Sequence, residues 1–381
     1  MLPEIHELLQ RPYEQGEPSA ADAHDHVAER LGVPTPHIRA LEQRIFEDLD
    51  PERFGIGWWE GQLDPPGRIL IADQLLLDTS SVPTNLIEAT LHRLAAAQAW
   101  QELRTRFRDR IRQGKPPGAP VPRSPADELP YVEADMHVAG VFRAVGSALD
   151  CLAGTLIGVA AIPRSILKAD FGASQRWLVQ HSREHPEWER LATHLDTVID
   201  QAGPFGWLDW AIDMRNMLVH RGRRLTMMLP YVSPEPMLLV PRSVIADRTE
   251  LAPLLPRDPG RSEVEVLRDT RTIAGLMLSE DGAKTLLRLV ESTIRLVEDT
   301  SIYLADLWQR RQADLALLPQ PGAQWPEVTP SQSSSLTGYD PGSIDIGDSG
   351  QLLANPQLGP RMRAAAVFND QLHLWATWTE T

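Results

Sequence analysis

The sequence is poor in cysteine. Its 381 residues include a single cysteine, Cys151, so no disulfide can form within the chain. A basic, apolar and cleavable N-terminal segment is also lacking, and both absences favour a reducing, cytoplasmic location. Cys151 lies in an apolar stretch, where a cysteine is typical of packing and not of thiol chemistry.

Long uncharged apolar runs are lacking as well. The most apolar stretch, residues 152–162, is preceded by the charged residues Asp150 and Arg143, which leaves it too short to span a bilayer. We therefore expect a core helix there and no membrane partner. With 42% hydrophobic residues, the chain can still bury a substantial core.

Positive charge is in deficit. The formal net charge is -15 at pH 7, and Lys115, Lys168 and Lys284 are the only lysines among 37 Lys and Arg residues. Broad binding to nucleic acid depends on neutralising phosphates, so this balance disfavours it and makes DNA an unexpected partner. Any contact with RNA must therefore be local.

One short stretch, residues 215–222, gathers groups suited to chemistry at a phosphodiester. Arg215 offers a permanently charged fork that matches phosphate. His220 is the type of side chain best able to give and take protons near neutral pH, and Asn216 adds an amide.

The spacing of an arginine and a histidine is weak evidence alone. Composition predicts roughly three Arg–His pairs at four to six intervening residues among the 11 histidines. The chain has three, which are Arg30 with His37, Arg176 with His181, and Arg215 with His220. Helix breakers at Gly32, Pro34 and Pro36 interrupt the first, and the second lacks a polar residue after its arginine.

The third pair lies on a predicted amphipathic helix that follows Pro204 and Gly206 and ends at Gly222. Its apolar stripe consists of Trp207, Ala211, Met214 and Leu218. At roughly 100° per residue, the opposite side carries Asp209, Asp213, Asn216 and His220, with Arg215 between the two faces. A solvated polar stripe is the alternative interpretation. Arg221, Arg223 and Arg224 make the helix end basic and favour an RNA contact.

Other apolar patterns predict a helical bundle. Helices are expected over about 86–113, 187–201 and 281–312, in addition to the motif helix. The strongest seam consists of Phe142, Val145, Leu149, Leu152, Leu156 and Val159. A second seam consists of Leu287, Val290, Ile294, Val297, Leu304 and Trp308, with Ser301 in one register. Each stripe needs the others for burial.

The predicted fold class is therefore mainly α, with a small β insertion before the last long helix. Residues 1–82 form an N-terminal helical region, in which Trp58 and Trp59 anchor the region to the rest. Residues 83–318 form the bundle, with short β-leaning runs inserted at about 225–270. Residues 319–381 are a Pro, Gly and Ser rich tail that ends in a short docking segment.

The order of Arg215, a polar residue, three further residues and His220 resembles the signature of HEPN domains. These are helical bundles, and many are ribonucleases of toxin and antiviral systems. The resemblance covers about residues 83–312. It implies RNA cleavage by attack of the ribose 2′-hydroxyl on the adjacent phosphorus, with no metal and no cofactor. It also implies a homodimer whose two motifs line one cleft, and an antitoxin or sensor protein as a further partner.

The same resemblance implies roles for single residues. His220 transfers protons, Arg215 carries charge for the phosphate, and Asn216 positions them. Asp213 and Asp209 are weaker candidates for orienting groups. The candidates for substrate binding are Arg221, Arg223, Arg224 and Asp213.

Three alternatives stay open. The first is a catalytically silent HEPN module that binds a nucleotide or a protein. The second is a helix-turn-helix regulator with a sensor bundle, suggested by the offsets of Ala28, Gly32 and Ile38. Residues 1–53 hold 12 acidic residues and 5 arginines, however, which favours a hairpin that merely packs. The third is a zinc site at His181-Ser-Arg-Glu-His185, although Pro186 disfavours helical geometry at His185.

Overall fold

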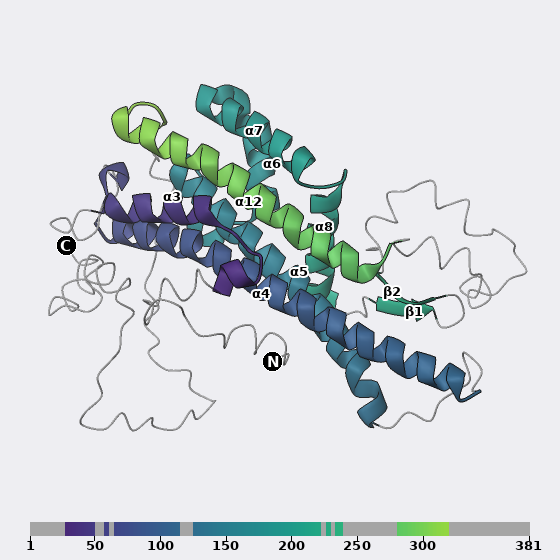
Figure 1. Cartoon of the computed structure of the whole chain (residues 1–381). Helices are drawn as coiled ribbons and strands as arrows, with labels where there is room; N and C mark the ends of the chain where they lie inside the picture. The colour runs from purple at the N-terminus through teal and green to yellow at the C-terminus, as the bar shows by residue number, and fades with distance from the viewer. Residues whose placement is uncertain are drawn as a thin grey trace, which may run out of the picture.

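The fold is mainly α-helical, as the sequence predicts. The computed structural model describes residues 27–49, 57–60, 65–114, 125–221, 226–229, 233–238 and 280–319. Its long helices are α4 (Pro65–Arg112), α5 (Pro125–Val159) and α12 (Gly282–Ala313). They run along the length of the molecule, and α3 (Pro36–Glu47) packs on α4 and α12 (Figure 1).

Helix α5 is the core helix that the sequence predicts. It packs along α4 as an antiparallel hairpin, and every residue of its predicted seam is buried, with Phe142 and Leu152 fully enclosed. The span Glu128–Val159 is long and apolar enough to cross a membrane by length and composition. Its most apolar window is 78% buried inside the protein, however, which is typical of a core helix.

The predicted start of the helix expected over residues 86–113 was wrong. The sequence predicts a helix from residue 86 and a boundary between residues 82 and 83, but α4 begins at Pro65 and continues through Pro83. A proline removes one backbone hydrogen bond and normally interrupts a helix. Here buried side chains on both sides of it, including Leu75 and Leu86, pack against the bundle and hold the helix together.

Helix α12 matches its predicted range, and most of its predicted seam is buried. Val290, Val297, Ser301, Leu304 and Trp308 are buried, whereas Leu287 and Ile294 are only half-buried. The true stripe is wider, because Leu289, Leu296 and Leu307 are buried as well. A helix that is contacted by α3, α4, α5 and α7 buries more than a two-position seam.

The N-terminal region is fastened to α12 at both ends of α3. Glu298 accepts hydrogen bonds from the backbone N–H groups of His37 and Ile38 at 3.0 and 3.3 Å. Asp48, at the other end, accepts one from Nε1 of Trp308 at 2.7 Å. This packing is what a helical hairpin predicts, and the alternative of a DNA-binding regulator stays untested.

The tryptophans Trp58 and Trp59, in the short helix η2 (Trp58–Glu60), act as the predicted anchor. Their ring centroids lie 4.9 and 4.7 Å from that of Trp308. The guanidinium of the buried Arg311 lies over the rings of Trp58 and Trp308. It donates to the carbonyl oxygens of Gly158 and Val159, at the end of α5. The N-terminal region, α5 and α12 therefore meet in one aromatic cluster.

Three shorter helices complete the bundle. They are α6 (Phe171–His181), α7 (Pro186–Ala202) and α8 (Trp207–Arg221). The single turn η3 (Ile166–Lys168) lies between α5 and α6, and η4 (Ser182–Glu184) lies between α6 and α7. The sequence predicts α7 and α8, but α6 was missed. Its start is fixed by Asp170, whose carboxylate accepts a hydrogen bond from the backbone N–H of Ala173 at 2.6 Å.

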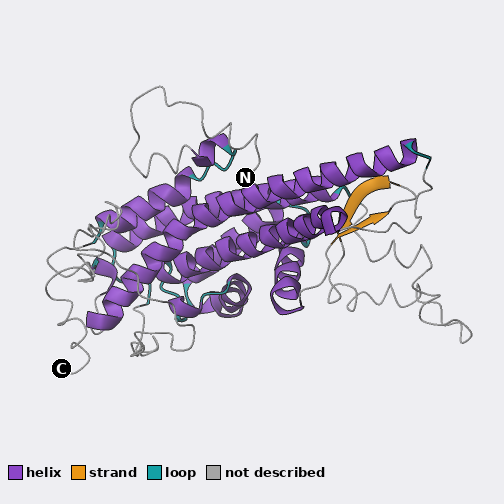
Figure 2. Ribbon diagram, turned by 90° about the horizontal axis from the view of Figure 1, so that it is seen from below, coloured by secondary structure: helices purple, strands orange, loops and turns teal. Residues whose placement is uncertain are grey.

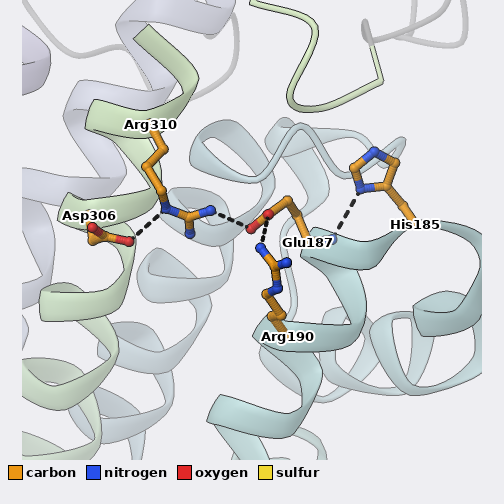
Figure 3. Close-up of polar contacts among 5 residues, drawn as sticks. All are labelled: His185, Glu187, Arg190, Asp306 and Arg310. Atoms are coloured by element: carbon orange, nitrogen blue, oxygen red, sulfur yellow. Dashed lines mark hydrogen bonds and ion pairs between the residues drawn. The ribbon is translucent and has the colours of Figure 1, made fainter. Parts of the chain in front are cut away.

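A buried carboxylate joins α7 to α12 (Figure 3). Glu187 is 3% exposed and accepts hydrogen bonds from Arg190 and Arg310, the latter at 2.8 Å. Arg310 also donates to Asp306 at 2.7 Å. Figure 3 shows both guanidinium groups pointing at this one carboxylate. The ion pairs therefore fix α7 against the long helix.

The arrangement of the nearby histidines does not fit the zinc alternative. His181 ends α6, whereas His185 is the N-cap of α7 and its Nδ1 accepts from the backbone N–H of Glu187 at 3.2 Å. The two rings are thus not on one helix face, as that alternative requires. The residues with described positions contain no group of three His, Cys, Asp or Glu side chains that could hold a metal.

A two-stranded antiparallel hairpin stands where the β insertion is predicted. It consists of β1 (Thr226–Leu229) and β2 (Ser233–Leu238), and β2 contacts α4 and α12 at one end of the bundle (Figure 2). Strand β2 contains Pro234 and Pro236, although proline cannot donate a hydrogen bond to a strand pairing. Among the described residues β2 pairs with β1 alone, and a strand that is unpaired on one side tolerates proline. The other β-leaning run, 264–267, and the tail from residue 320 lie outside the described residues.

Candidate functional site

The motif helix α8 lies against α5 through its apolar side. The predicted stripe of Trp207, Ala211, Met214 and Leu218 is buried throughout. Arg215 leaves the helix toward α5, where it crosses Gly146 closely. A Cβ on that glycine would lie 2.7 Å from Cγ of Arg215. A glycine at this position of α5 is therefore what lets the arginine side chain pass.

An ion pair fixes the end of the Arg215 side chain. Its Nη2 lies 2.6 Å from Oδ2 of Asp150 on α5, and the two side chains are 28% and 27% exposed. The other carboxylate oxygen, Oδ1, accepts from the backbone N–H of Phe171 at 3.2 Å. Nη1 of Arg215 donates to Oδ1 of Asn216 at 3.3 Å. The guanidinium is thus oriented by one carboxylate and one amide.

The charge state of Asp150 reflects opposing influences. Burial raises the pKa of Asp150 above its ordinary value, and Asp170 nearby acts in the same direction. Arg215 and the Phe171 N–H act in the opposite direction, because both favour the carboxylate. The ion pair therefore depends on Arg215 to keep a partly buried acid ionised.

A small pocket lies beside this ion pair, between α5, α8 and the start of α6. Its lining consists of Val145, Gly146, Leu149, Asp150, Asp170, Phe171, Gly172, Ala211, Ile212 and Arg215. The volume is about 10 Å³, which is about the space that one water molecule occupies. A nucleotide cannot enter it, so any larger ligand must lie over its mouth.

Two further titratable groups lie behind Asp150, at the contact between α5 and α4. Burial raises the pKa of Asp78 to about 7, against a hydrogen bond from Gln74. A Cβ on Gly154 would lie only 1.8 Å from Oδ2 of Asp78, so the carboxylate occupies the space that a side chain at position 154 would need. Burial raises the pKa of Cys151 to about 12. Such a thiol stays protonated near neutral pH, as expected of a packing residue.

Only some of the predicted site residues lie at or beside the pocket. Arg215 lines the pocket, and Asn216 accepts a hydrogen bond from its Nη1. Asp213 is half-buried and Asp209 is exposed. His220 belongs to α8, but its side chain and that of Arg221 lie outside the description, as do Arg223 and Arg224 entirely.

Asp150 was missed in the sequence, although it contacts the motif directly. A signal was present, because it is a charged residue within the most apolar seam of the chain. A carboxylate at such a position needs a partner. The identity of that partner depends on the packing of α8 against α5, which no local pattern reveals.

Comparisons with known proteins give no match. The chain matches no protein-family model, no curated protein and no solved structure at a significant level. The resemblance to HEPN domains thus rests on the motif and on the helical context of Arg215.

Proposed function

We propose that the protein is an endoribonuclease of HEPN type, which acts as a homodimer and needs neither a metal nor a cofactor. In this reaction, the 2′-hydroxyl oxygen of a ribose bonds to the adjacent phosphorus while the bond from phosphorus to the 5′-oxygen breaks. One group takes the proton of the hydroxyl, and another gives a proton to the leaving oxygen. His220 is the proposed proton-transfer group and Arg215 the proposed charge at the phosphate.

The observation that carries the proposal is the orientation of Arg215. A guanidinium that is held by Asp150 and Asn216 beside a pocket is positioned before any ligand arrives. Preorganised charge of this kind stabilises a crowded phosphoryl group because it needs no reorganisation during the reaction. A guanidinium on a solvated surface stripe would have no such supports.

The helix also supports a two-subunit site. α8 is continuous from Trp207 to Arg221, so the positions of Arg215 and His220, five residues apart, differ by about 140° around its axis. One straight helix cannot direct both groups at one phosphate. A two-fold dimer can, because the arginine of one subunit then lies opposite the histidine of the other.

The test is cleavage of RNA by the full chain and by a His220→Ala variant, with the dimer followed by light scattering. We expect the parent chain to cut RNA and leave a cyclic phosphate, and the variant to keep its dimer and lose cleavage. Loss of cleavage together with the dimer would point to a structural role for His220. A parent chain that cuts no RNA under any activating condition would contradict the proposal.

One observation favours a second candidate, a catalytically silent HEPN module that binds a nucleotide or a protein. The ion pair with Asp150 already balances the charge of Arg215. A module of this kind would bind its ligand with no cleavage, and its binding would not change in the His220→Ala variant.

The remaining parts of the nuclease proposal are a cytoplasmic setting, a role in defence or a toxin–antitoxin system, and an antitoxin or sensor partner.

A further inference from the structure

A second arginine, Arg176 of α6, lies at the rim of the Arg215 pocket. A Cβ on Gly172, which lines the pocket, would lie 3.2 Å from Nη1 of Arg176 and 3.7 Å from Oδ1 of Asp170. The arginine therefore runs back along α6 by one turn, as long side chains in helices commonly do. Arg176 belongs to the weaker Arg–His pair in the sequence, yet it lies beside the pocket of the stronger one.

Arg176 differs from the other charged groups at this pocket. Arg215 pairs with Asp150, and Asp170 accepts from the backbone N–H of Ala173. Arg176 is exposed, and within the described part of the chain it has no hydrogen bond or ion pair. The two arginines, Arg215 and Arg176, and the two carboxylates, Asp150 and Asp170, together carry no net charge. The two carboxylates have fixed donors, so the cation that faces solvent is the one an incoming anion meets.

We propose that Arg176 binds a phosphate group of an RNA strand over the mouth of the Arg215 pocket. This inference rests on the proposed function, because it assigns a substrate contact to the same site. The pocket, with a volume of about 10 Å³, has room for about one water molecule, so the phosphate group lies outside it. An exposed guanidinium reaches that place, and its planar fork matches phosphate oxygens.

The experiment measures binding of a labelled single-stranded RNA by the full chain carrying His220→Ala, so that the probe is not cut. Affinity is followed against salt concentration with Arg176→Ala added, and separately with Arg183→Ala added. Arg183 is an exposed arginine of η4 away from the pocket lining, and so it serves as a matched control. Arg176→Lys tests whether a restored charge rescues binding.

We expect Arg176→Ala to weaken binding and to reduce the slope of log affinity against log salt by about 0.7, the value for one phosphate contact on a single strand. Arg183→Ala leaves the slope unchanged, and Arg176→Lys restores it. An unchanged slope in Arg176→Ala, an equal loss in Arg183→Ala, or absence of any RNA binding overturns the inference. Tight binding of inorganic phosphate alone, lost in Arg176→Ala, would overturn the assignment to RNA.

The two proposals fail in distinguishable ways. If the parent chain binds RNA through Arg176 but never cuts it, the nuclease proposal fails and the phosphate contact stands. If the parent chain cuts RNA and Arg176→Ala binds as before, the nuclease proposal stands and the contact is wrong. Circular dichroism of the Arg176 variants confirms that an exposed substitution has left the fold intact.

Discussion

Arg215 of α8 and Asp150 of α5, 65 residues apart in the sequence, are joined by a 2.6 Å contact between Nη2 and Oδ2. The contact decides where the guanidinium of the motif points. It also ties the motif helix to the core helix of the bundle. The consequences for activity and stability are open to experiment.

Asp150→Asn removes the charge that orients Arg215 while keeping an acceptor for the Phe171 N–H. We expect cleavage to fall by about ten- to hundredfold, because a displaced catalytic group loses that much. RNA affinity should be kept, because the arginine retains its charge. Asp170→Asn is the matched control, since asparagine also caps a helix. Equal losses in both variants would show that only the local negative charge matters.

Gly146→Ala places a Cβ against the Arg215 side chain, 2.7 Å from Cγ and 3.1 Å from Nε. The arginine must move, so we expect cleavage to fall by about tenfold or more. The free energy of unfolding should change little or fall, because the greater helix preference of alanine, about 0.5–1 kcal/mol, is offset by the clash and by displacement of the ion pair with Asp150. Ser147→Ala, one residue on, controls for a change in α5. Full activity of Gly146→Ala would mean that the position of Arg215 is unimportant.

Asp78→Asn should change how stability depends on pH. Burial raises the pKa of Asp78 to about 7, so between about pH 4 and pH 7 the unfolded chain binds fewer protons than the folded chain. The stabilising contribution of the neutral acid is complete below about pH 4. It is lost as the pH rises to 7, by at most about 1.4 kcal/mol per pH unit.

Urea denaturation of the parent and of Asp78→Asn between pH 4 and pH 8 measures this difference. Asparagine keeps an acceptor for Gln74, which donates to Asp78 at 2.8 Å, and it does not titrate. The variant should therefore gain stability relative to the parent as the pH rises. Parallel curves for the two chains would show that Asp78 is ionised in the folded protein at acidic pH.

Glu187→Gln should destabilise the bundle without affecting RNA binding. The substitution leaves Arg190 and Arg310 without the buried carboxylate that both contact. Both arginines reach solvent, so we expect the free energy of unfolding to fall by about 1–3 kcal/mol. Glu184→Gln, at an exposed position of η4, is the control and should change stability little. A neutral effect of Glu187→Gln would mean that α7 is held by its apolar face alone.

The sequence predicts those elements whose side chains follow a clear period. The stripe of α8 and the seam of α5 were correct, because these helices bury one face along their full length. The start of α4 was wrong because Pro83 resembles a break, and only packing against α5 shows that it is not. Helix α6 was missed because it is short and its start depends on a single cap, Asp170.

The candidate site was predictable only in part. The motif residues Arg215 and Asn216 are visible in the sequence because they are local to one helix. The place of Asp150 and Arg176 at the pocket is not, because they come from other helices and reach the pocket through tertiary packing. The close approach of Arg215 to Gly146 is of the same kind, since a glycine in a helix gives no sign of which side chain crosses it.

The central claim, that two subunits share one site, is tested most directly by mixing two inactive chains. Arg215→Ala and His220→Ala subunits are combined in equal amounts and allowed to exchange, and RNA cleavage by the mixture is measured. If the arginine of one subunit serves with the histidine of the other, each mixed dimer regains one intact site. The mixture should then recover about a quarter of the parental activity. A mixture as inactive as either variant alone, beside an active parent, would contradict a shared site.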